Sequence, residues 1–192
     1  MSASLHGAIN MTNTNGLKFE KFDLHVHTPA SNDHKNKSIT AEDIVAASTN
    51  KGLAGIAITD HQTGAWVDSI KKAAEKTDLS IFPGVELKVV GGEEGVHVVV
   101  IFNIDKDTAH VTAFLNTLNV YEHNGKPDLI TTKTVMDVAN ELQKFDPAAI
   151  LILAHANSSA GVGADMKGLQ RSEIFKPEYK CVFRSKVATI PL

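Results

Sequence analysis

A short segment with two histidines one residue apart constrains this chain more than any other feature. It spans residues 23–28 and reads Asp-Leu-His-Val-His-Thr. In a strand, side chains alternate between two faces, so Asp23, His25 and His27 share one face and the two apolar residues share the other. Two imidazoles on one face contribute little to packing but can bind one metal ion. The segment therefore predicts a metal-binding strand, although an exposed strand can carry such a pair by chance.

The composition is that of an ordinary globular chain. Its 192 residues are 43% hydrophobic and 21% charged, enough for one domain with a substantial core. The net charge of −3 provides no general attraction for nucleic acid, so a polyanion would have to be bound locally. Cys181 is the single cysteine, which excludes an internal disulfide and favours a cytoplasmic location. No apolar run is long enough to cross a bilayer, and the first residues lack a signal-peptide pattern.

The order of predicted elements indicates an α/β fold. Residues 1–17 are expected to form a flexible leader, and residues 18–192 a single metal-binding domain. Capping and periodicity predict helices over residues 40–51, 66–76, 107–121 and 131–145. Apolar runs predict strands over residues 22–27, 53–59, 79–87, 96–102 and 149–154, the third of them broken by Pro83-Gly84. This alternation predicts a parallel sheet, either barrel-like or doubly wound.

Residues that can bind metals fall in or directly after these predicted strands. In α/β barrels the carboxyl ends of the strands form one rim, where the connecting loops converge. A single polar residue at a strand end is usually only a cap, but five strands that each deliver one are hard to explain by capping. The predicted ligands are His25, His27, His61, Glu86, His97 and His155, with Asp33 in the loop after the first strand.

The surroundings of these residues differ in what they indicate. Glu86 lies in an apolar strand, where a carboxylate is costly unless a charge such as a bridging metal compensates it. His155 follows an apolar run and is interpreted in the same way. His97 can alternatively be a core histidine with a hydrogen-bonded partner, and Asp33 can alternatively serve a turn.

The residue types also indicate the metal and the chemistry. Imidazoles and carboxylates without a thiolate favour zinc, manganese or iron, and the number of ligands predicts two or three ions. Such clusters hydrolyse phosphate esters, because the metals generate a bridging hydroxide and stabilise the leaving oxygen. Asp60 and His61 are the candidate catalytic residues, with Asp60 or an acidic residue of a loop managing protons. Asp23 and Asp60 are also placed to orient ligand imidazoles.

The motifs around these residues resemble those of the PHP domain, the polymerase and histidinol phosphatase family of metal-dependent phosphoesterases. Residues 23–28 carry the first motif, and Ile-Thr-Asp-His, Gly-Val-Glu-Leu and Leu-Ala-His-Ala follow at residues 58–61, 84–87 and 153–156. The resemblance covers residues 19–157. It implies a distorted (β/α) barrel, seven-stranded in the family, with a trinuclear metal centre.

The resemblance also assigns the predicted ligands to separate metals. It implies that His25 and His27 bind the first metal and that Glu86 bridges to the second. His97 and His155 would complete the second metal. Asp33 and His61 would bind the third.

The C-terminal part of the chain departs from the family pattern. The family ends with an Asp-x-His motif, and nothing of that form follows His155. We therefore expect an incomplete barrel, whether the chain is a fragment or a natural short form. The third metal site, with Asp33 and His61, is expected to be weak, empty or completed by another group. Open strand edges favour a homo-oligomer or association with a missing C-terminal segment.

Four functions fit the sequence. The leading hypothesis is a metal-dependent phosphoesterase that hydrolyses a phosphate mono- or diester, with a small phosphorylated compound or nucleotide as substrate. The second is a non-catalytic, metal-binding regulatory module of a larger protein or complex. The third is a nuclease acting on DNA ends, for which Lys35, Lys37 and Lys88 are the only basic support. The fourth is a C–N hydrolase of the amidohydrolase type, but the metal-bridging lysine and late Asp that it needs are not evident.

Overall fold

The structure, a computed structural model, describes residues 19–120, 125–126, 130–155 and 181–183. The expected leader and most of the chain after His155 lie outside these ranges. No helix in the described ranges is long and apolar enough to span a membrane. The strands are β1 (Lys21–Val26), β2 (Leu53–Ile58), β3 (Ser80–Val90), β4 (Val96–Ile101), β5 (Ile130–Thr134), β6 (Ile150–Leu153) and β7 (Cys181–Phe183). The helices are α1 (Ala41–Asn50), α2 (Val67–Ala74), α3 (Thr108–Thr117) and α4 (Val135–Phe145).

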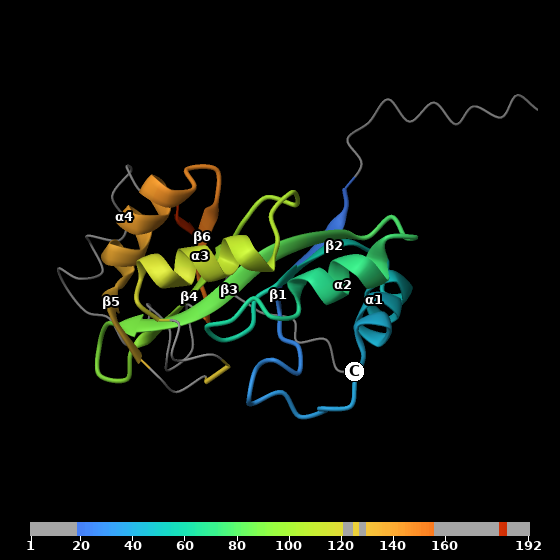
Figure 1. Ribbon diagram of the computed structural model, residues 1–192, viewed down its shortest axis with the longest axis horizontal. Coiled ribbons are helices and arrows are strands. Elements are labelled where there is room, and N and C mark those ends of the chain that lie inside the picture. The colour runs from blue at the N-terminus through green and yellow to red at the C-terminus, as the bar shows by residue number, and fades with distance from the viewer. Residues whose placement is uncertain (1–18, 121–124, 127–129, 156–180, 184–192) are drawn as a thin grey trace, which may run out of the picture.

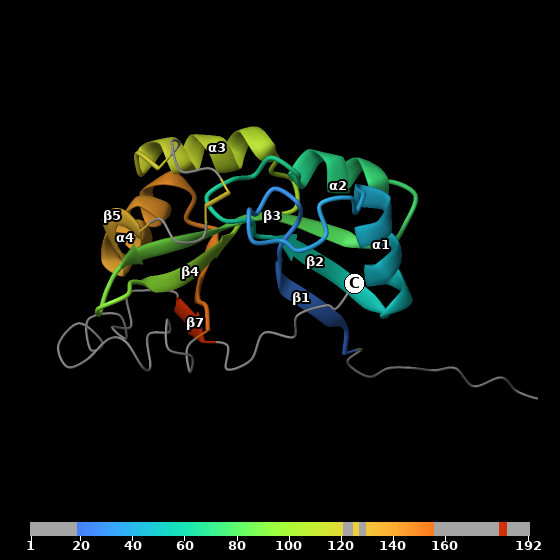
Figure 2. The ribbon, with the colours of Figure 1, turned by 90° about the horizontal axis from the view of Figure 1, so that it is seen from below.

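The strands form one curled, mixed sheet in the order β1-β2-β3-β4-β6-β7, and β5 pairs with β3. Figure 1 shows β3 as the long central strand, and Figure 2 shows the four helices on one side of the sheet. The α/β class and the incomplete barrel are thus confirmed. The prediction of a parallel sheet is wrong at β4, which runs antiparallel to both β3 and β6. Residues 91–95 are too few for the crossover that parallel strands require, so β3 and β4 form a hairpin.

Two predicted element boundaries also differ from the structure. The predicted helix over residues 131–145 is a strand followed by a helix, because four of the five residues of β5 are β-branched and favour a strand. The third strand continues through Pro83 instead of breaking there. Its ladder with β4 begins only at Gly84, so the missing N–H of Pro83 lies beyond that ladder.

The main core lies between the sheet and the helices, and a smaller apolar cluster lies on the opposite face of the sheet. This smaller cluster contains Ala57 of β2, Val99 and Ile101 of β4, and Ile152 of β6. Strands buried on both faces explain the nearly continuous apolar runs in the sequence.

Two helices begin with the same capping box. The side chains of Thr40 and Thr134 accept from the backbone N–H of Asp43 and Asp137, and these carboxylates accept from the threonine N–H groups. The backbone and side-chain hydrogen bonds from Thr40 and Thr134 lower the pKa of Asp43 and of Asp137. A carboxyl whose pKa is lower in the folded state stabilises the protein above its unfolded pKa, and this contribution is lost as the pH falls through the folded pKa.

We therefore expect a variant with both Asp43→Asn and Asp137→Asn to be less stable than the wild type near pH 7. The difference in free energy of unfolding between wild type and variant should narrow as the pH falls below about 4, because both wild-type carboxylates then become protonated. Urea unfolding at a series of pH values measures this. A difference in stability that stays constant with pH would show that the ionised carboxylates of Asp43 and Asp137 do not stabilise the fold.

Candidate metal centre

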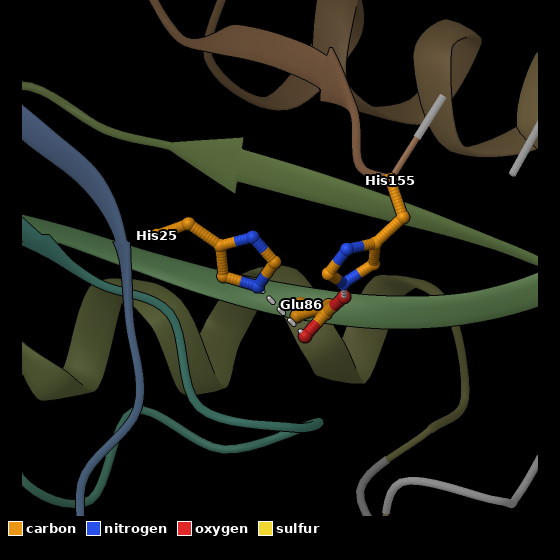
Figure 3. Close-up of side chains that lie close together, drawn as sticks. All are labelled: His25, Glu86 and His155. Carbon is orange, nitrogen blue, oxygen red and sulfur yellow. Dashed lines mark hydrogen bonds and ion pairs between the residues drawn. The ribbon is translucent and has the colours of Figure 1, made fainter. Parts of the chain in front are cut away.

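Five imidazoles surround one buried carboxylate at the centre of the molecule. The carboxylate belongs to Glu86, which is fully buried in the middle of β3. Figure 3 shows His25 from β1 and His155 from the end of β6, both directed toward it. The other three imidazoles come from the ends of neighbouring strands. They are His27 directly after β1, His61 after β2, and His97, the second residue of β4.

Both oxygens of Glu86 contact imidazole nitrogens. Oε2 lies 3.0 Å from Nε2 of His25, 2.9 Å from Nε2 of His27 and 3.4 Å from Nδ1 of His61. Oε1 lies 2.7 Å from Nδ1 of His97 and 3.5 Å from Nε2 of His155. A carboxylate with ligand-type nitrogens around both oxygens is arranged as a bridge between two positive centres.

The main chain holds Glu86 and His61 together. His61 forms a parallel bridge with Glu86 in the stretch of β3 between its partners β2 and β5. The N–H of Glu86 donates to the carbonyl of Asp60 at 3.1 Å, and the N–H of Gln62 donates to the carbonyl of Glu86 at 2.9 Å. These backbone bonds fix the distance between the two side chains before any ligand binds.

Two groups of donor atoms can each bind a metal ion. One consists of His25, Glu86 and His155, and the other of His27, His61 and Glu86, with the donor atoms of each group within 4.8 Å of one another. Ligands about 2.1 Å from a tetrahedral ion lie about 3.4 Å apart. The contacts of Glu86 with His61 and His155, at 3.4 Å and 3.5 Å, have this spacing, and its other imidazole contacts are shorter, at 2.7–3.0 Å. Nitrogen and oxygen donors without a thiolate suit zinc, manganese or iron. The donor set therefore fits a pair of divalent ions that share Glu86.

The electrostatics of the centre suit cations. Burial alone would raise the pKa of Glu86, but contacts with the surrounding imidazoles, that of His155 first, hold it well below its usual range. Burial lowers the pKa of His61. Burial also acts to lower the pKa of His27, but the hydrogen bond and charge of Glu86 outweigh it and raise that pKa. These pKa directions favour an ionised Glu86 and a neutral His61, the forms that bind metals, whereas the raised pKa of His27 makes metal binding compete with its protonation.

His97 reaches the centre from the amino end of its strand, although the sequence predicted a rim made of carboxyl ends. Because β4 is antiparallel to β3, its first residues lie beside the last residues of β3, and His97 pairs with Lys88. The contact between His97 and Glu86 is compatible with a metal ligand and with a hydrogen-bonded core histidine. His155 lies directly after β6 with a φ of 49°, an unfavourable conformation for a residue other than glycine.

Asp33 lies at the outer edge of the centre. Its Oδ2 is 3.5 Å from Nε2 of His61, and its side chain is 52% exposed. Within the described residues it belongs to neither of the two metal-binding groups. A third metal at this position would have Asp33 and His61 as its described ligands, so the expectation of a weak third site stays a prediction.

Asp60 lies fully buried beneath the loop that follows β1. Its Oδ1 accepts from the N–H of Thr28 at 2.6 Å and from the hydroxyl of Ser31 at 2.7 Å. Its Oδ2 accepts from the hydroxyl of Thr28 at 2.7 Å. The structure thus shows Asp60 as an anchor for this loop, and the proton-managing role stays a prediction. Asp23 accepts from the backbone N–H of His25 at 3.2 Å.

Two residues of the centre were missed by the sequence reasoning. Ser31 is fully buried and contacts both His27 and His61. Gly125 lies between α3 and β5, donates its N–H to the carbonyl of His61 at 2.7 Å and accepts from the N–H of Asn32 at 2.7 Å. The motifs contain neither residue, and a serine beside Asn32 is equally typical of an ordinary turn.

Comparisons with known proteins establish the family. The sequence matches the PHP domain over residues 23–161, and the chain belongs to the PHP domain family. It is 26% identical over 125 residues to a 5′-3′ exoribonuclease of Haemophilus influenzae, an alignment that covers 65% of this chain and 40% of the relative. It is 33% identical over 91 residues to the 5′-3′ exoribonuclease Rnm of Salmonella typhimurium, covering 46% of this chain and 29% of the relative. The chain thus spans less than half the length of these relatives.

Two solved structures share the fold. One, from Bifidobacterium adolescentis, is described as a metal-dependent phosphoesterase and aligns with 81% of this chain and 73% of its own, with a TM-score of 0.53 and 16% identity. The other is a two-domain protein of Bacteroides vulgatus that contains a predicted PHP-like metal-dependent phosphoesterase. It aligns with 81% of this chain and 40% of its own, with a TM-score of 0.54 and 16% identity.

Proposed function

We propose that this protein hydrolyses a phosphate ester with the help of two divalent metal ions bound on either side of Glu86. The observation that carries the proposal is the pair of donor groups that share this one carboxylate. His25 and His155 would hold one ion, and His27 and His61 the other. This grouping differs from the one implied by the family resemblance, which places His25 with His27 and His97 with His155. When bound, such ions activate a water molecule and stabilise the charge of the phosphoryl group and the leaving oxygen.

The chain's own residues supply position and charge. Glu86 would hold both ions, because its main chain is held in β3 and its carboxylate is fully buried. Asp33 faces His61 from the exposed loop, where a carboxylate can orient a water or accept a proton from it. The partial exposure of His27 and His155 marks the side from which a substrate can approach.

The second candidate is narrower: an exoribonuclease that cleaves the phosphate diester at the 5′ end of RNA. The names of the two relatives favour RNA over the DNA ends considered from the sequence. Lys88 supports a polyanionic substrate, because it pairs with His97 in the sheet and directly opposed residues share a face. Lys88 is partly exposed, and its side chain starts on the face of the sheet that carries His97.

Hydrolysis assays on metal-stripped and reloaded protein test both proposals. The substrates are p-nitrophenyl phosphate, bis-p-nitrophenyl phosphate, and 5′-phosphorylated RNA and DNA oligonucleotides of the same sequence, each with manganese, zinc or iron. We expect metal-dependent hydrolysis that is lost in His25→Ala and retained in His110→Ala, a matched histidine that contacts Asp146 outside the centre. Release of nucleotides from RNA alone would favour the exoribonuclease. Metal binding without turnover on any substrate would contradict catalysis and favour the regulatory module.

A further inference from the structure

Ser31 occupies a junction that belongs to no recognised motif. Its side chain is fully buried in the loop after β1. Its hydroxyl oxygen lies 2.8 Å from Nδ1 of His27, 2.7 Å from Oδ1 of Asp60 and 3.0 Å from the backbone nitrogen of His61. One atom therefore contacts both imidazole residues of a single metal-binding group.

The hydrogen-bonding capacity of a hydroxyl determines the direction of each contact. A serine hydroxyl donates one hydrogen bond and accepts two. A carboxylate oxygen can only accept, so the Ser31 hydroxyl donates its proton to Oδ1 of Asp60, which also accepts from the N–H of Thr28. The backbone N–H of His61 can only donate, and it fills one acceptor position of Ser31. The remaining acceptor position faces Nδ1 of His27, which must therefore carry a proton.

We propose that Ser31 is a positioning residue that fixes the tautomer and ring orientation of His27 for metal binding. With Nδ1 protonated and bonded to Ser31, the lone pair of Nε2 is left for a metal beside Glu86, whose Oε2 is 2.9 Å away. Asp60 determines the orientation of the Ser31 hydroxyl, because its Oδ1 accepts the hydrogen bond that this hydroxyl donates. The inference rests on the metal centre proposed above and adds the device that orients one of its ligands.

The arrangement is selective for one of the two metal-binding groups. Ser31 contacts His27 and the main chain of His61, whose side chains form one group with Glu86. His25 and His155 instead contact Glu86, at 3.0 Å and 3.5 Å. Loss of the hydroxyl is therefore expected to weaken one site and leave the other unchanged, which a general loss of packing would not do.

Zinc titration of the metal-stripped protein with a competing chelator tests this selectivity. We expect Ser31→Ala to lower the affinity of one zinc site by about 10- to 100-fold and to leave the other site unchanged. Ser31→Thr keeps the hydroxyl and is expected to restore the affinity. The matched control is Ser48→Ala, which removes an equally buried hydroxyl that donates to Ile44 within α1.

Nitrogen-15 spectra of histidine-labelled, zinc-loaded protein test the tautomer directly, including in the wild type alone. We expect a slowly exchanging Nδ1–H resonance for His27 in the wild type and in Ser31→Thr, and rapid exchange in Ser31→Ala. Zinc bound through Nδ1 of His27 would overturn the inference, as would equal weakening of both sites in Ser31→Ala. Zinc binding with the expected spectra but no ester hydrolysis would contradict only the proposed function.

Discussion

Glu86→Gln is expected to abolish metal-dependent hydrolysis and to weaken the binding of both metal ions by at least about 100-fold. Glutamine keeps the size of the side chain but has no charge, and its amide nitrogen cannot serve as a ligand. Each of the two metal-binding groups contains this residue, so the loss must affect both. Zinc titration and the p-nitrophenyl ester assays measure the two effects.

The matched control is Glu141→Gln, which changes a glutamate in α4 that pairs with Lys144 on the surface. It is expected to bind metals and hydrolyse esters as the wild type does. A Glu86→Gln variant that loses only one ion would show that Glu86 does not bridge. Retention of both ions would contradict the whole site.

The sequence predicted the centre better than the sheet that carries it. The convergence of His25, His61, Glu86 and His155 could be anticipated, because each lies in or directly after an apolar run that had to be a strand. Strand ends meet at a common edge wherever the sheet is parallel, and β1, β2 and β3 are parallel. The direction of β4 was missed because a continuous apolar run looks the same in a parallel and an antiparallel strand.

The sequence suggested Asp60 as a residue that orients a ligand imidazole, but Ser31, which links Asp60 to His27, could not be identified from it. Ser31 contacts His27, four residues before it, and Asp60, 29 residues after it. No local pattern encodes the second contact. The contacts of His110, a histidine outside the centre, could not be predicted from the sequence either. The sequence places it in a predicted helix and does not indicate its surroundings. In the structure its ring packs against Phe102 and Phe145 and pairs with Asp146, because α3 and α4 lie side by side.

Gly125→Ala is expected to reduce hydrolysis by about 100-fold, although Gly125 has no side chain that could bind a metal. Gly125 joins the loop that carries Asp33 to the segment that carries His61, through its carbonyl and its N–H respectively. A Cβ atom there would collide with the carbonyl oxygen of Ala30 and lie 3.2 Å from Oδ1 of Asn32. The backbone must then move, and one or both hydrogen bonds must break.

The backbone conformation adds a cost that must be separated from this collision. Gly125 has a φ of +75°, where any residue other than glycine is strained. Gly52 provides the matched control, because its φ is +65° and a Cβ atom there would meet nothing within 4 Å. Gly52→Ala should therefore lower the free energy of unfolding by about 1 kcal/mol and leave hydrolysis unchanged. Urea unfolding and ester hydrolysis of both variants measure the two contributions.

The difference between these variants isolates what the α3–β5 connection does for the metal centre. Gly125→Ala should lose about 1–3 kcal/mol more stability than Gly52→Ala, because it adds overpacking to the same backbone strain. Gly125 bonds to Asn32 and His61, so zinc should still bind to His25, Glu86 and His155, while the distance between Asp33 and His61 changes. Equal stability and equal hydrolysis in the two glycine variants would show that Gly125 does not help to position the residues of the metal centre.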